Sequence, residues 1–128
     1  MQVTTGVDII EVDRIRKAIE TGGQAFLMKV YTEQEIMYCN KSENMKYQHF
    51  AARFAAKEAV FKAISSHING REDTMWRNIE VVNNIDGKPT INLERLRTER
   101  LITLKSIDIS ISHIKDYAVA SAVAMFEK

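Results

Sequence analysis

The fold is decided by a stretch near the middle of the chain, Arg53-Phe-Ala-Ala-Lys-Glu-Ala-Val-Phe-Lys-Ala63. Its apolar residues recur at helical spacing, which predicts a helix. This is the longest expected helix, from about Tyr47 to Ser66, and Asn69-Gly70 follows it.

Glu58 is the most informative residue of that helix, because it lies among apolar neighbours on the helical wheel. Phe54 precedes it by four residues and Phe61 follows it by three, and two alanines lie close by, Ala51 and Ala55. A carboxylate on a face that turns toward protein costs free energy unless it is paired. The partner is either Lys62, as an ordinary helix ion pair on a solvated face, or a metal ion. Lys57 is expected to be a solvated helix residue.

A second acid lies in the apolar run Val7-Asp8-Ile9-Ile10, inside an expected strand from Val3 to Ile10. Strand alternation places Asp8 on one face with Gly6 and Ile10. Asp8 could simply end the strand or cap the following helix. Alternatively, two carboxylates in apolar settings, far apart in sequence, indicate one site assembled by folding.

The other expected elements give an α+β fold, an antiparallel sheet packed against one long helix and shorter helices. A helix over Asp13–Glu20 is stopped by Gly22-Gly23. Thr32 and Glu35 form a capping box that opens a second helix. The rest of the chain is expected to form strands 78–83 and 90–93 around the turn 86–89, a short charged helix 94–100, and strands 107–112 and 117–126. There is no βαβ pattern and no Gly-rich phosphate loop after a strand.

The last strand has a face of small residues, which are Ala118, Ala120, Ala122 and Ala124. Such a face indicates close packing, against either the long helix or a neighbouring subunit.

Length and composition predict one domain over 1–128, and the net charge of +1 gives no global reason to expect nucleic acid or a membrane as partner. Cys39 is the only cysteine, which excludes an intrachain disulfide and fits a structural role. The N-terminal residues lack the pattern of a secretory signal, and no apolar stretch approaches the roughly 20 residues of a membrane span. The expected location is the cytoplasm.

Three segments in order carry a resemblance to a known family. They are Gly6-Val-Asp-Ile-Ile-Glu-Val-Asp-Arg-Ile15, the stretch 53–63, and Ser110-Ile-Ser-His-Ile-Lys-Asp-Tyr-Ala118. Together they resemble holo-acyl-carrier-protein synthase, the small bacterial type of 4′-phosphopantetheinyl transferase. The resemblance covers nearly the whole chain.

The resemblance implies transfer of the phosphopantetheine arm of coenzyme A to a serine of apo acyl-carrier protein, in fatty acid biosynthesis. Asp8 and Glu58 match the metal-binding positions, and Mg²⁺ commonly takes one or two protein carboxylates plus substrate phosphate oxygens. Glu58, or a water that it orients beside the metal, is the expected base for the serine. Lys62 matches a position near the transferring phosphate, where it either neutralises charge or protonates the leaving group.

The resemblance also implies which residues bind the coenzyme A nucleotide. Arg53 and His113 match positions at the nucleotide end, and an arginine fork suits a phosphate. The turn Gly87-Lys88-Pro89 and the Ser112 hydroxyl are further candidates. Lys88 is otherwise a solvated turn lysine, and His113 a loop histidine bonded to backbone.

The acidic recognition helix of acyl-carrier proteins implies a basic partner surface. Arg14 matches the acceptor-contacting arginine, and Arg16 and Lys17 either extend that charge or lie on a solvated helix face. Members of the family assemble as homotrimers with active sites at subunit interfaces, so a homotrimer is expected here.

Two other functions remain open from the sequence. One is a Mg²⁺-dependent hydrolase of coenzyme A or nucleotides, which uses the same acids with water as nucleophile. The other is a non-catalytic carrier-protein-binding module, which would be expected to lack one of Asp8, Glu58 and Lys62, yet all three are present.

Overall fold

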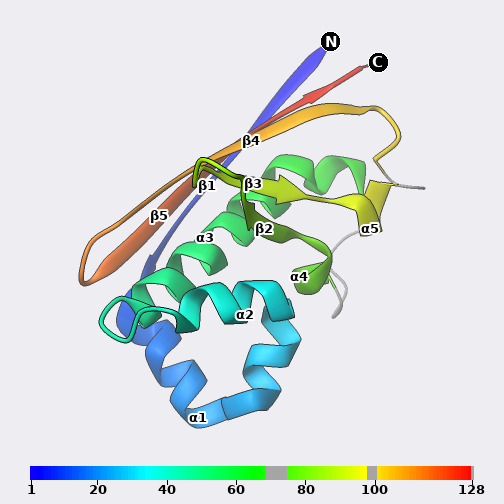
Figure 1. The fold of residues 1–128 in the computed structure, drawn as a ribbon. Helices are drawn as coiled ribbons and strands as arrows, with labels where there is room; N and C mark the ends of the chain where they lie inside the picture. Colours follow the sequence, from blue (N-terminus) through cyan, green and yellow to red (C-terminus); the bar gives the residue numbers. More distant parts are fainter. Residues whose placement is uncertain (69–74, 98–100, 128) are drawn as a thin grey trace.

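The computed structural model describes residues 1–68, 75–97 and 101–127, and within them a three-stranded antiparallel sheet forms one layer. The strand order is β1-β5-β4, with bounds Gln2–Glu11 for β1, Leu104–His113 for β4 and Tyr117–Phe126 for β5. Asp8 lies inside β1, opposite Ala120 of β5. The two chain ends therefore meet at one end of the sheet (Figure 1).

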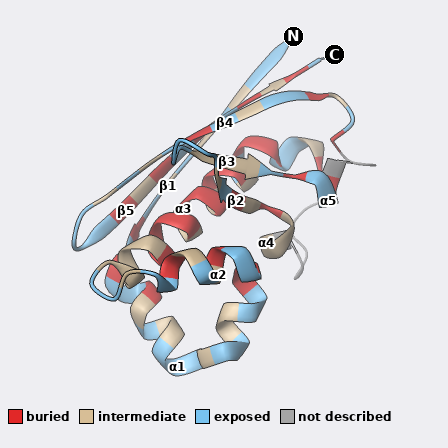
Figure 2. Cartoon of the chain, in the orientation of Figure 1, coloured by how far each residue is buried: buried red, intermediate tan, exposed pale blue. Residues whose placement is uncertain are grey.

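The long helix α3 (Lys46–Ile64) packs across the inner face of this sheet and carries the core. It lies between the sheet and helices α1 and α2 (Figure 1), and it is buried along most of its length (Figure 2). The small-residue face of β5 is covered by α3, so the long helix, of the two candidates, is what packs there within the chain. The four residues of that face are 1% exposed or less, namely Ala118, Ala120, Ala122 and Ala124.

Helix α1 (Val12–Val30) is longer than the sequence predicts. The predicted interruption at Gly22-Gly23 is present, because Gly23 has non-helical backbone angles (φ 57°, ψ −139°). The sequence did not predict the second helical stretch, which continues from there and buries Val30. Helix α2 (Glu33–Asn40) begins with the predicted capping box, since the Thr32 side chain accepts from Glu35 N and the Glu35 carboxylate accepts from Thr32 N.

The second half forms a hairpin with a sheet of its own, β2 (Glu80–Asn83) paired with β3 (Pro89–Asn92). Gly87 makes the turn with φ 89°, a backbone conformation that favours glycine. Asn78 is helical rather than extended, because it closes a short helix before β2. The remaining elements are the 3₁₀ turn η1 (Ser65–His67) and the short helices α4 (Met75–Asn78) and α5 (Glu94–Arg97). The predicted Asn69-Gly70 break and residues 98–100 of the charged helix lie outside the described residues.

The outer face of the sheet bears apolar side chains that are left exposed by the part of the chain that the structure describes. Val3, Val7 and Ile9 of β1 are 57%, 60% and 66% exposed, and Val123 of β5 is 46% exposed. Among the described residues no helix is long and apolar enough to cross a membrane.

Candidate active site

Three elements bring ionisable side chains to one cavity of about 420 Å³. Asp8 comes from β1, Arg14 from α1 and Glu58 from α3, so residues 50 positions apart meet on folding. The same cavity has an apolar wall of Ile9, Ile10, Ile15, Ala18, Phe26 and Phe54. Charged groups against an apolar wall interact more strongly than in open water, which is how many reactive sites are built.

Gly6 sets how closely Asp8 approaches α3. A Cβ built at Gly6 would lie 1.9 Å from the Ala59 carbonyl oxygen, so only glycine lets β1 pack this close to the helix backbone. The Thr4 hydroxyl, also on this face, donates to the Ala63 carbonyl oxygen. Both contacts fix the height of Asp8 on the helix. The idea that Asp8 merely ends the strand or caps the next helix is wrong, because Glu11 occupies the cap position of α1.

The neighbours of Asp8 determine the pKa of its carboxyl group. Its Oδ1 lies 3.3 Å from Lys62 Nζ, and the same ammonium donates to the Val7 carbonyl oxygen at 2.8 Å. The side chain of Asp8 is 17% exposed. Burial raises the pKa of this carboxyl; its hydrogen bond to Lys62 and the charges of Lys62 and Arg14 lower it, and the charge of Glu58 raises it further. A second carboxylate is therefore close enough to Asp8 to repel it.

The face of α3 around Glu58 is only partly as predicted. Ala51 and Ala55 are fully buried, whereas Phe54, Glu58 and Phe61 are half-buried. Of these three, Phe54 and Glu58 line the cavity. Between Phe50 and Ile64 the helix is otherwise buried except at Lys62, and α3 is drawn mostly as buried in Figure 2. Half-burial leaves Glu58 accessible from the cavity.

The basic residues of α1 divide into two groups. Arg14 faces the cavity with Asp8 and Glu58. Arg16 is instead held by Asp13 and by Glu20, at 3.4 Å for the latter, and Lys17 Nζ lies 3.0 Å from Asp13. Their charge is largely balanced on the helix surface.

Arg53 lies in a different part of the molecule. It is 4% exposed, its guanidinium stacks 3.8 Å from the centre of the Tyr38 ring, and it donates to Asn83 Oδ1 of the hairpin. It lines a separate cavity of about 580 Å³ between α2 and the hairpin, with Glu80.

The remaining candidates lie on the hairpin turn and at the β4–β5 connection. Lys88 Nζ is 3.7 Å from Asp108 Oδ2, and both side chains are more than half exposed. His113 pairs through Nδ1 with Gln48 Oε1 at 2.8 Å, so it is bonded to a side chain rather than to backbone, and Ser112 is exposed on the outer face. Neither residue reaches the Asp8 cavity.

Lys57 is the clearest error of the sequence interpretation. It is fully buried rather than solvated, and its Nζ lies 2.6 Å from Glu35 Oε1. Because Glu35 already had a local role in the capping box, nothing in the sequence indicated that it also pairs with Lys57 of α3. Cys39 is buried as expected, and burial raises its pKa to about 12.

The donor set suits a hard divalent cation. Two carboxylates, Asp8 and Glu58, line one cavity, and no group of three or more His, Cys, Asp or Glu side chains arises among the described residues. Mg²⁺ commonly takes one or two carboxylates and completes its shell with water and phosphate oxygens. Burial raises the pKa of Asp8 and the charge of Glu58 adds to the rise, and a bound cation would favour the charged form of both carboxylates.

Comparisons with known proteins define the class. A model of the 4′-phosphopantetheinyl transferase superfamily matches residues 4–122. The chain is 46% identical over 125 residues to the holo-[acyl-carrier-protein] synthase of Ruminiclostridium cellulolyticum, covering 96% of this chain and 92% of that protein.

Solved structures agree with this class. The holo-[acyl-carrier-protein] synthase of Helicobacter pylori, in complex with coenzyme A, superposes with a TM-score of 0.79 at 27% identity over 94% of this chain and 99% of that one. The Bacillus anthracis synthase, in complex with CoA (3′,5′-ADP), gives 0.75 at 33% identity over 94% of each chain. The chain therefore belongs to the holo-[acyl-carrier-protein] synthases of the 4′-phosphopantetheinyl transferase superfamily.

Proposed function

We propose that this chain transfers the 4′-phosphopantetheine arm of coenzyme A to a serine hydroxyl of apo acyl-carrier protein in fatty acid biosynthesis, with Mg²⁺ as the metal. Adenosine 3′,5′-bisphosphate leaves. The observation that carries this proposal is the meeting of Asp8 and Glu58 in one cavity beside Arg14, in a chain of this family. The nucleophile belongs to the carrier protein, so no Ser-His-Asp arrangement is required of this chain.

The reaction breaks a pyrophosphate P–O bond and forms a phosphodiester. Asp8 and Glu58 would hold Mg²⁺, which supplies Lewis-acid stabilisation of charge on the phosphate oxygens when bound. In our proposal Glu58 accepts the proton of the serine hydroxyl, and its half-buried position leaves it reachable from the cavity. Lys62, already 3.3 Å from Asp8, neutralises negative charge that builds on the phosphate and the leaving group.

The nucleotide end of coenzyme A is assigned to a second group of residues. Arg53 would contact a phosphate with its guanidinium, and His113 and the Ser112 hydroxyl would add donors. The turn of Gly87, Lys88 and Pro89 would follow the nucleotide, with the backbone N–H groups of the turn and Lys88 Nζ as donors.

Residues of these two groups line different cavities of a single chain, which supports a site built between copies. Arg53 lines the cavity between α2 and the hairpin, whereas Asp8 lines the cavity between β1, α1 and α3. The exposed apolar outer face of the sheet supplies a surface for assembly, and Val3, Val7 and Ile9 lie along its edge strand β1. We propose a homotrimer in which each active site takes residues from two subunits, because cyclic symmetry repeats one contact around a ring.

Complementation tests this assembly. Asp8→Asn and Arg53→Ala are each expected to be inactive alone. Refolding them together in equal amounts restores activity in about a quarter of the sites, because an intact site must take Asp8 from an Arg53→Ala subunit and Arg53 from an Asp8→Asn subunit. No recovery in a trimer of mixed subunits would contradict the shared site, and a monomer by analytical ultracentrifugation would contradict the assembly.

The acceptor surface centres on Arg14. It lies at the cavity that holds both carboxylates, where a carrier-protein serine must arrive. The charges of Arg16 and Lys17 are balanced by Asp13 and Glu20, so they contribute less than Arg14. We place the reaction in the cytoplasm, because cysteines stay reduced there and Cys39 is a buried free thiol.

Intact mass spectrometry of apo acyl-carrier protein, incubated with this chain, coenzyme A and Mg²⁺, tests the function. The expected result is a gain of one phosphopantetheine group that a chelator abolishes. Metal-dependent loss of coenzyme A without that gain would favour the hydrolase, and no change in either would favour the non-catalytic module.

A further inference from the structure

Lys57 occupies an unusual position for a lysine, inside the core directly before Glu58. Its side chain is 0% exposed, and so is that of Glu35, whose Oε1 lies 2.6 Å from Nζ. An ion pair removed from water is tolerated only when its remaining hydrogen-bonding groups are also satisfied. The residues around Lys57 and Glu35 must therefore supply the remaining hydrogen-bond partners.

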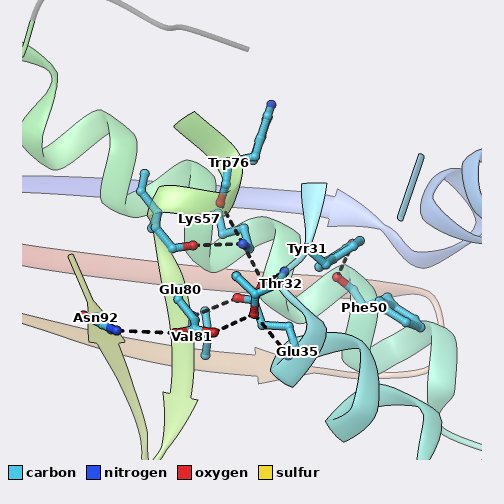
Figure 3. A network of polar contacts seen from close by, with 10 residues as sticks. Tyr31, Thr32, Glu35, Phe50, Lys57, Trp76, Glu80, Val81 and Asn92 are labelled. Atoms are coloured by element: carbon cyan, nitrogen blue, oxygen red, sulfur yellow. Dashed lines mark hydrogen bonds and ion pairs between the residues drawn. The ribbon is translucent and has the colours of Figure 1, made fainter. Parts of the chain in front are cut away.

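The polar atoms of both side chains have hydrogen-bond partners within the protein. Besides Glu35, Lys57 Nζ donates to the Trp76 and Ile79 carbonyl oxygens, each at 2.8 Å, so all three protons of the ammonium have an acceptor. Glu35 Oε2 accepts from Val81 N at 2.8 Å. Figure 3 shows Lys57 Nζ at the centre of these contacts.

The network joins three parts of the chain that are separate in sequence. Lys57 belongs to α3, Glu35 to the first turn of α2, and Val81 to β2 of the hairpin. A further contact runs from the Thr32 hydroxyl to Glu80 Oε2 at 2.6 Å, and Asn92 of β3 reaches Glu80 Oε1 at 3.4 Å. The hairpin is thereby attached by side chains to two helices.

This attachment matters because, among the described residues, the hairpin shares no sheet with β1, β4 and β5. Its position relative to α3 is fixed by packing and by the Lys57 network instead of by a strand ladder. The next residues along β2 lead directly to the nucleotide candidates. Asn83 accepts from the Arg53 guanidinium through Oδ1, and its Nδ2 donates to the Gly87 carbonyl oxygen at 2.9 Å.

We propose that Lys57 and Glu35 form a positioning pair that sets the hairpin turn 87–89 and Arg53 for the nucleotide of coenzyme A. The pair does not contact substrate. It acts through Val81 and Asn83 on the residues that do. This inference rests on the proposed function, because it deepens the assignment of Arg53 and the turn to coenzyme A.

Glu35→Gln is the primary test, since the amide keeps the shape but removes the charge and one acceptor. We expect the KM for coenzyme A to rise about tenfold, as when a group that orients a ligand-binding residue is removed. The KM for the carrier protein and kcat at saturating coenzyme A stay within about twofold, because the Asp8 cavity lies outside the network. Hydrogen exchange at the Val81 amide should accelerate, since its acceptor is weakened.

A second variant guards against simple loss of folding. Lys57→Met with Glu35→Gln leaves no buried charge unpaired, so its melting temperature exceeds that of Lys57→Met alone. It still lacks the bonds to the Trp76 and Ile79 carbonyls, so its KM for coenzyme A remains raised. Ile109→Ala, in the core of the three-stranded sheet and away from the network, serves as the control of lowered melting temperature with unchanged KM values.

The outcomes separate clearly. Lowered melting temperatures with a wild-type KM for coenzyme A, or equal rises in both KM values, would overturn the positioning role. Calorimetric binding of coenzyme A distinguishes this failure from failure of the proposed function. A wild-type chain that binds coenzyme A without transferring its arm sinks the transferase, while weaker binding by the variants still supports the pair. A wild-type chain that does neither overturns both.

Discussion

Gly6→Ala probes the packing that brings Asp8 to Glu58. The new Cβ would lie 1.9 Å from the Ala59 carbonyl oxygen and 3.0 Å from Ala63 N, which are backbone atoms of a buried helix and cannot rotate away. Ordinary contact begins at 3.4 Å, so strand and helix must separate by about 1.5 Å, the difference from 1.9 Å.

Asp8 lies two residues along β1 and moves with it. A misplacement of about 1 Å at a reacting centre costs roughly 100-fold in rate, so we expect Gly6→Ala to lose about that much transfer activity. Forcing an extra carbon into a packed interface also lowers the free energy of unfolding by about 1–3 kcal/mol. The assay is transfer to carrier protein followed by intact mass, at a temperature where circular dichroism shows the variant folded.

Ala59→Gly is the matched control, because it weakens the same helix turn by about 1 kcal/mol without pushing the strand away. It should keep most of the wild-type rate. A folded Gly6→Ala protein that transfers as fast as wild type would refute the argument that this close contact sets the position of Asp8.

Three further predictions use other parts of the molecule. Arg14→Ala should raise the KM for carrier protein about tenfold with coenzyme A binding intact, and Arg16→Ala, whose charge is already balanced, should change it less; the reverse order would contradict the acceptor surface. The Cys39 thiol, with its pKa raised by burial, should resist Ellman's reagent until the chain unfolds, and rapid labelling of the native protein would contradict its burial. Burial, with the nearby His113 and Arg53, lowers the pKa of His49, so the unfolded chain binds that proton more readily and stability should fall as pH drops through about 6.5. His49→Gln should flatten the melting temperature between about pH 7 and pH 5, and an unchanged slope would remove His49 as the cause.

Local patterns predicted most of the fold because each depends on near neighbours. The alternation in Ile107, Ile109 and Ile111 gave β4, and the capping box at Thr32 gave the start of α2. The glycine pair at 22–23 marked the interruption of α1, but the helical stretch after it was not predicted. That stretch is stabilised by burial of Val30, a tertiary contact that has no local signal.

Patterns predicted the site less completely, because pairing across the fold carries no local signal. Asp8 and Glu58 were recognisable as acids in apolar runs, and the structure does place them at one cavity. Lys57 was misjudged because its partner Glu35 lies 22 residues upstream in another helix. A lysine between Ala56 and Ala59, on a helix with alanine on several sides, was the available sign that its side chain is buried.

The central claim is that Asp8 and Glu58 together hold the metal for phosphopantetheine transfer. The most direct measurement is the transfer rate of Asp8→Asn and Glu58→Gln over a Mg²⁺ titration, with Glu127→Gln as a control that removes an exposed carboxylate elsewhere. Both site variants should fold normally and lose at least about 100-fold in rate at saturating coenzyme A and carrier protein, while the control keeps wild-type activity. Near-normal rates in both variants would contradict the claim.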